Sequence, residues 1–193
     1  MRKINIRSAA CVPMMVFVLL AAMMPSFFTT IQAVAQTTPE ADPKDVESID
    51  AIIEILYAVI SGPAGQERDW DKFRSLFVPD AKLIPVAVPQ NDPAVVRIMT
   101  VEDFVTNSTP NFMANGFFER EIARKTEQFG HIAHVFTTYD SKRLKSDKEP
   151  FARGINSIQL FNDGKRWWIV NIFWDSERPN QPLPDKYLPK KGG

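Results

Sequence analysis

The stretch FARGINSIQLFNDGKRWWIVNIFW, residues 151–174, decides the fold, because apolar and polar side chains alternate on both sides of its Asn-Asp-Gly-Lys sequence. Alternation with a period of two is typical of β-strands, and such a sequence between two alternating runs is typical of a tight hairpin. With Asp163 and Gly164 as the loop residues, Ser157 pairs with Val170. The stretch therefore predicts two antiparallel strands.

Three helices are predicted upstream of these strands, at residues 44–62, 69–77 and 100–113. The first has apolar side chains at steps of three and four, namely Val46, Ile49, Ile53, Leu56 and Ile60. The third begins with a Thr-x-x-Asp capping box. Residues 81–89 are rich in β-formers but interrupted by proline, which predicts an edge strand or an irregular segment.

Alternation replaces the helical period after Gly116, in residues 117–128, 131–140, 151–161 and 166–174. Helices that precede a run of strands favour an α+β fold. The sequence therefore predicts three N-terminal helices packed on a strongly curved antiparallel sheet.

The first 35 residues have the pattern of a signal peptide. Three basic residues precede a long apolar run, and Ala33 and Ala35 stand at the −3 and −1 positions of a cleavage site. An uncleaved membrane anchor is the alternative, although Pro13 and Pro25 interrupt the apolar run. Cleavage after Ala35 predicts a periplasmic or secreted protein. The expected organisation is a signal peptide at 1–35, a linker at 36–44, one domain at 45–177 and an extended Pro-rich tail at 178–193.

Composition excludes several functions. After cleavage the chain has 20 Lys and Arg and 23 Asp and Glu, which gives a formal charge of −3. The sequence has no basic patch of the kind that nucleic-acid binding requires. Cys11 lies in the signal peptide, so the mature chain has no cysteine. His131 and His134 point to opposite faces of a strand and cannot share one metal ion. We expect no metal, no cofactor and, after cleavage, no membrane association.

The order of these motifs resembles the nuclear transport factor 2-like superfamily, which includes ketosteroid isomerases and SnoaL-type polyketide cyclases. The resemblance covers residues 45–177 and rests on LYAVISG at 56–62, DWDKFRSLFVPDAKL at 69–83, FGHIAHVFTTY at 129–139 and FNDGKRWWIVNIFWDSE at 161–177. It implies that the helices and the curved sheet form a cone around a mostly apolar pocket. It does not by itself imply a function.

The resemblance also suggests which face of the sheet lines the pocket. At the position of Ser157 the isomerases have an acidic residue that points into the pocket. The resemblance therefore implies that the side chains on the face of Ser157 line the pocket: Glu121, His134, Phe136, Thr138, Arg153, Ser157, Trp168 and Trp174. Trp167 then lies on the outer face, beneath a partner subunit or the tail. A shift of one residue in register would reverse this assignment.

The candidate chemistry combines Tyr57, Glu121, His134 and Arg153, with walls made by Trp70, Phe73, Phe136, Trp168 and Trp174. His134 can act as a base and Tyr57 as a proton donor, while Arg153 can bind a carboxylate. The alternative is an internal Glu121–Arg153 salt bridge, with the other two as hydrogen-bonded core residues. Pro85 and Ser157 stand where the isomerases have their two acids, so steroid isomerisation is not expected.

Three functions are compatible with these residues. The first is an exported protein that binds a small, mostly apolar ligand, which can carry a carboxylate. The second is a lyase-, isomerase- or cyclase-like enzyme that transfers protons without a metal. The third is a structural or interaction protein whose cavity is filled by its own side chains. A homodimer through the outer sheet face is expected in each case, because that face would otherwise expose a large apolar patch.

Overall fold

The structure is a computed structural model that describes residues 38–90 and 92–190. The predicted signal peptide and its cleavage site lie outside the described residues. No helix within the described ranges is long and apolar enough to cross a membrane.

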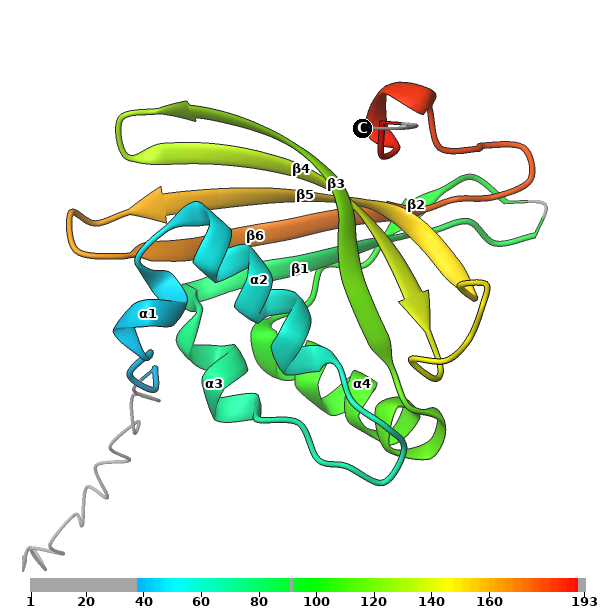
Figure 1. Cartoon of the computed structure of the whole chain (residues 1–193), viewed down its shortest axis with the longest axis horizontal. Helices are drawn as coiled ribbons and strands as arrows, with labels where there is room; N and C mark the ends of the chain where they lie inside the picture. The colour runs from blue at the N-terminus through cyan, green and yellow to red at the C-terminus, as the bar shows by residue number, and fades with distance from the viewer. Residues whose placement is uncertain (1–37, 91, 191–193) are drawn as a thin grey trace, which may run out of the picture. The chain divides into compact units, whose positions relative to one another are not determined.

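Six strands of the described residues form one sheet in the order β2-β1-β6-β5-β4-β3. Their bounds are β1 Phe77–Ala87, β2 Val95–Val96, β3 Phe118–Phe129, β4 Ile132–Lys142, β5 Ala152–Asn162 and β6 Trp167–Ser176. Neighbouring strands are antiparallel except β1 and β6, which run parallel. The sheet is strongly curved, with a marked bend in β3 (Figure 1). The proline-interrupted segment is thus part of β1, which has a neighbour on each side.

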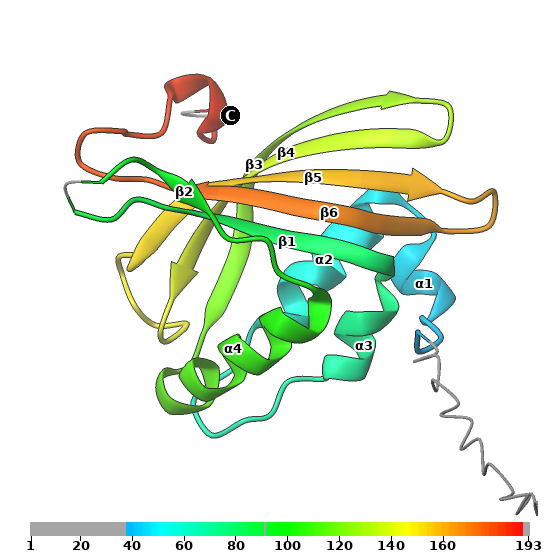
Figure 2. The same cartoon turned by 180° about the vertical axis from the view of Figure 1, so that it is seen from behind.

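In the described part of the chain, four α-helices and one 3-10 helix accompany the sheet: α1 Pro43–Val46, α2 Ile49–Ile60, α3 Trp70–Ser75, α4 Val101–Asn115 and η1 Asp185–Tyr187. The first predicted helix is divided because the Ser48 hydroxyl accepts a hydrogen bond from the Ala51 amide at 3.0 Å and so starts α2. The predicted capping box of α4 is present. Helices α2, α3 and α4 lie on one side of the sheet (Figures 1 and 2). The predicted α+β fold class is confirmed.

The hydrophobic core fills the space between these helices and one face of the sheet. Its sheet members alternate along the strands and include Ala133, Val135, Tyr139, Ile158, Leu160 and Ile169, all buried. Full burial of each large aliphatic side chain contributes about 1.5–3 kcal/mol. Odd-numbered residues of β4 and even-numbered residues of β5 therefore face the helices. The predicted assignment of the two faces was wrong for these strands.

The β5–β6 hairpin has a longer loop than predicted. The last pair of the ladder is Asn162 and Trp167, so the loop has four residues, 163–166. Within it the Asp163 carboxylate accepts hydrogen bonds from the amides of Lys165 and Arg166 at 2.8 and 2.9 Å. The pairing predicted for Ser157 was wrong, because its partner is Phe173.

Strand β6 contains a β-bulge at Val170. Ile169 and Asn171 pair with consecutive residues of β5, so Val170 is an extra residue. A bulge reverses the alternation of the side chains that follow it. Trp167 faces the helices before the bulge, and Trp174 does so after it.

Strand β3 contains a second bulge, at Ile122. Glu121 and Ala123 pair with consecutive residues of β4, which leaves Ile122 without a partner in the ladder. The bulge turns Glu119 and Glu121 toward α2, where strict alternation would turn them away.

The C-terminal segment, residues 178–190, crosses the other face of the sheet (Figure 2). The Tyr187 ring packs against Phe136 with 5.0 Å between centroids, and the Thr138 hydroxyl donates to the Tyr187 carbonyl at 2.6 Å. This segment covers part of the outer face within one chain.

Candidate functional site

An interior cavity of about 220 Å³ lies between the helices and the sheet. Aliphatic and aromatic side chains from α2, α3, α4 and the sheet form most of its wall. Its polar members are Tyr57, Ser108, Glu119, Tyr139 and Asn156. An apolar cavity of roughly 150 Å³ is large enough to bind benzene, so this one can hold a molecule at least that large.

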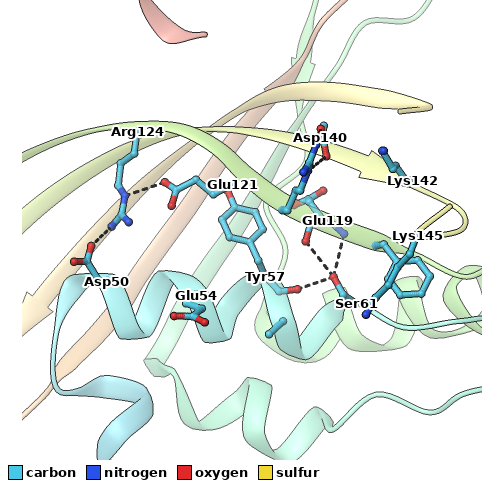
Figure 3. Close-up of a pocket in the computed structure, with 13 residues that line it drawn as sticks. Asp50, Glu54, Tyr57, Ser61, Glu119, Glu121, Arg124, Asp140, Lys142 and Lys145 are labelled. Carbon is cyan, nitrogen blue, oxygen red and sulfur yellow. Dashed lines mark hydrogen bonds and ion pairs between the residues drawn. The ribbon is translucent and has the colours of Figure 1, made fainter. Parts of the chain in front are cut away.

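A second hollow, a groove of about 670 Å³, runs between α2 and β3 and is open to solvent. Charged side chains line it, including Asp50, Glu121 and Arg124 (Figure 3). Tyr57 and Glu119 line both the groove and the interior cavity. These two side chains therefore stand where the two hollows meet.

The Tyr57 hydroxyl is part of a directed chain of hydrogen bonds. Asn156 Nδ2 donates to Tyr57 Oη at 3.0 Å, and Tyr57 Oη lies 3.2 Å from Thr137 Oγ1. Thr137 gives its only hydroxyl proton to Glu121 Oε1 at 2.8 Å, so the Tyr57 proton must point to Thr137. Glu121 remains an acceptor because Arg124 pairs with it at 2.9 Å.

Tyr57 is consequently a hydrogen-bond acceptor toward the cavity, with one lone pair free. Its burial and the negative charge of Glu119 raise the pKa of Tyr57 well above its ordinary value. The tyrosine therefore stays neutral, and its proton is directed away from any ligand that enters.

Glu119 is the titratable group at this junction. Burial raises the pKa of its carboxyl group to about 7, partly offset by hydrogen bonds from Ser141 and Asn156, and the nearby charge of Asp140 raises it further. The Ser141 hydroxyl donates to Glu119 Oε2 at 2.7 Å. Glu119 can therefore take up or release a proton near neutral pH.

The sequence analysis did not single out Glu119, because no motif distinguishes it from the other charged side chains of residues 117–128. Alternation places Glu119 on the same face as Glu121, which the resemblance had turned inward. The register of β3 on β4 shows that Glu119 and Glu121 both point toward α2 and that Glu119, unlike Glu121, also lines the cavity.

The structure brings several predicted residues together. Tyr57, Phe73 and Trp174 line the interior cavity. Trp70 packs behind them, with its ring 5.6 Å from that of Phe73. Glu121 lines the groove rather than the cavity.

Four other predicted residues lie on the outer face, because the register reverses their orientation: His134, Phe136, Ser157 and Trp168. His134 Nε2 is 2.9 Å from Ser157 Oγ on that face. The Trp168 indole donates to Asp163 at 2.8 Å and lies outside the cavity. The predicted pairing of His134 and Tyr57 in one pocket was wrong.

Arg153 is also placed away from the cavity. Its guanidinium group makes two hydrogen bonds to the Glu177 carboxylate, at 2.8 and 3.0 Å. The alternative salt bridge between Arg153 and Glu121 is not formed, since Glu121 pairs with Arg124. Across residues 38–90 and 92–190, no group of three His, Cys, Asp or Glu side chains is placed to hold a metal ion.

Comparison with solved protein structures identifies the fold. No family model and no curated protein matches the sequence. One similar solved structure is an NTF2-like protein with a cystatin-like fold from Novosphingobium aromaticivorans. The match covers 67% of this chain and 79% of that protein, at 13% identity and a TM-score of 0.51. A second is an NTF2-like protein of unknown function from Pseudomonas putida KT2440. The match covers 71% of this chain and 92% of that protein, at 11% identity and a TM-score of 0.51.

The chain has the NTF2-like fold. The fold predicted from the motif order is thereby confirmed. At these identities the likeness concerns the fold alone, and function has to be argued from the site. In this NTF2-like domain the site is the cavity, with Tyr57 and Glu119 at the point where it meets the groove.

Proposed function

We propose that this NTF2-like domain binds a small, mostly apolar molecule in its interior cavity. The observation that carries the proposal is an apolar hollow of about 220 Å³ with a few polar side chains, two of which stand at its junction with an open groove. Small-molecule sites commonly combine an apolar wall with a few placed polar groups. A ligand carboxylate is not expected at Arg153, because Glu177 already pairs with that side chain.

Benzene is a suitable first probe, since it has the shape and polarity of the cavity wall without any polar group. The Ser108→Leu variant places an apolar side chain in the cavity from α4. Thr106→Leu makes a similar change on the exposed side of the same helix and serves as its control.

The wild type and Thr106→Leu should show a saturable rise in Tm with benzene, because a ligand that binds only the native state stabilises it. Ser108→Leu should lose most of this rise. A wild type that does not respond, or a response that Ser108→Leu leaves unchanged, would contradict binding in the cavity.

A second candidate function is proton transfer without a metal, in the manner of a lyase, isomerase or cyclase. Glu119 takes the role of base here in place of His134, and the observation that favours it is a carboxyl group with a pKa of about 7 beside an apolar cavity. Glu119→Gln should then abolish turnover of a substrate and leave its binding nearly intact. Retained turnover would exclude this role.

We also propose export and a homodimer. The pattern of residues 1–35 supports export.

The outer face supports a dimer, because Phe161, Val170 and Phe173 keep 39%, 36% and 42% of their surface exposed. Sedimentation at micromolar concentration tests the dimer, and a monomer there would contradict it. The cavity gives no support to the third function, in which side chains fill the interior.

A further inference from the structure

Acceptor groups face the junction of cavity and groove. The Tyr57 proton points to Thr137, which leaves an oxygen lone pair free. The Glu119 carboxylate offers about four lone-pair sites, and one oxygen accepts the Ser141 hydroxyl. The two N–H groups of the Asn156 amide are directed to Tyr57 and Glu119. A ligand that enters here finds more acceptors than donors.

The Glu119 carboxylate also has no cationic partner. None of the ion pairs formed within residues 38–90 and 92–190 includes Glu119. The nearest arginines on its own strand are engaged, because Arg120 pairs with Asp140 and Arg124 pairs with Glu121. A partly buried carboxylate without a counter-charge is costly, and a cationic ligand can supply that charge.

The other polar and charged groups around Glu119 do not supply a positive counter-charge either. Strand β4 contributes Tyr139, Asp140 and Lys142, of which Lys142 donates to the Asp147 carbonyl at 2.7 Å. Helix α2 contributes Tyr57 and, along the groove, the acids Asp50 and Glu54. Lys145 lines the groove with its ammonium group over the Phe118 ring, at 5.5 Å.

We infer that the ligand of this cavity is an apolar amine, whose protonated head group binds Glu119 and the Tyr57 oxygen while its apolar part fills the hollow. This inference rests on the proposed function. It replaces the carboxylate-bearing ligand that the sequence suggested, because the positions of Glu119 and Arg153 favour the opposite charge.

The test compares four probes that share one ring: benzene, benzyl alcohol, benzylamine and benzoate. Titration calorimetry at pH 8 should give benzylamine an affinity about tenfold or more above that of benzyl alcohol, since hydrogen bonds to a charged group are the stronger ones. Benzoate should not bind, because its charge repels Glu119. Benzene should bind independently of pH.

Two further measurements assign the effect to Glu119. Glu119→Gln should remove the preference for benzylamine and keep benzene binding, whereas Glu54→Gln, which removes an exposed acid from the same groove, should keep both. In the wild type, lowering the pH from 8 to 5.5 should weaken benzylamine binding about tenfold or more, because Glu119 becomes protonated while the amine keeps its charge.

The outcomes separate the two proposals. If benzene binds and benzylamine binds no better than benzyl alcohol, the inference is wrong and the proposed function stands. The same conclusion follows if Glu119→Gln or the lower pH leaves the benzylamine preference intact. If none of the four probes binds, the proposed function fails, and the inference fails with it.

Discussion

Glu119 and Trp174 line the same interior cavity, and each faces it because a β-bulge reverses the alternation of its strand. The bulge at Ile122 turns the carboxylate inward, and the bulge at Val170 turns the indole inward. β-Bulges commonly re-aim side chains beside functional sites. In this domain they create a titratable group and an aromatic wall from residues that regular strands would point outward.

Glu119→Gln should change how stability depends on pH. The pKa of Glu119 is raised from 4.5 to about 7 on folding, so the native state binds more protons than the unfolded state between these values. The free energy of unfolding of the wild type should therefore fall by up to about 3 kcal/mol as the pH rises through this window. The variant should lack this decline and be the more stable protein at pH 8.

Urea denaturation between pH 4.5 and pH 8 measures this effect. Glu54→Gln removes an exposed acid from α2 and should behave like the wild type. Parallel pH profiles for the wild type and Glu119→Gln would show that Glu119 titrates normally, and would remove the charge argument for an amine ligand.

Trp174→Ala and Trp168→Ala should differ in stability, although the sequence pattern assigned both tryptophans to the pocket. Trp174 packs against the core, with its ring 6.5 Å from that of Phe104. Its loss should cost about 3 kcal/mol. Trp168 lies on the outer face, where Arg166 stacks on it at 3.6 Å, and its loss should cost about 1 kcal/mol. Equal costs in chemical denaturation would contradict the register of β6.

Tyr57→Phe and Thr137→Val should be coupled in stability. Removing the Tyr57 hydroxyl leaves the buried Asn156 amide without its partner, which costs about 1–3 kcal/mol. Because Thr137 belongs to the same chain of hydrogen bonds, the double variant should cost less than the sum of the single ones. A double-mutant cycle measures the difference, and strict additivity would contradict the directed chain through Tyr57.

Local sequence signals predicted the elements of the fold well. The apolar period placed α2, the capping box placed the start of α4, and the alternating segments placed four strands. These signals depend on residues close together in the chain. Tyr57 was also placed correctly on the buried side of its helix, because it lies one turn after Ile53.

The choice of the inner face could not be made in this way. Both faces of β5 and β6 carry apolar residues, and the tail covers Phe136 on the outer face, so hydrophobicity did not distinguish them. The four-residue loop changed the pairing, and the bulges at Ile122 and Val170 changed the parity of two strands. These features depend on long-range register, which no short segment encodes.

The most direct test of cavity binding is a benzene titration followed by methyl NMR of the protein. Methyl groups of Ile60, Leu83 and Ile172 line the cavity, whereas those of Ile132 and Val170 lie on the outer face. Binding in the cavity predicts saturable shifts, caused by the ring of the probe, in the first group and none in the second. Shifts confined to the outer face, or no saturable shift at all, would contradict it.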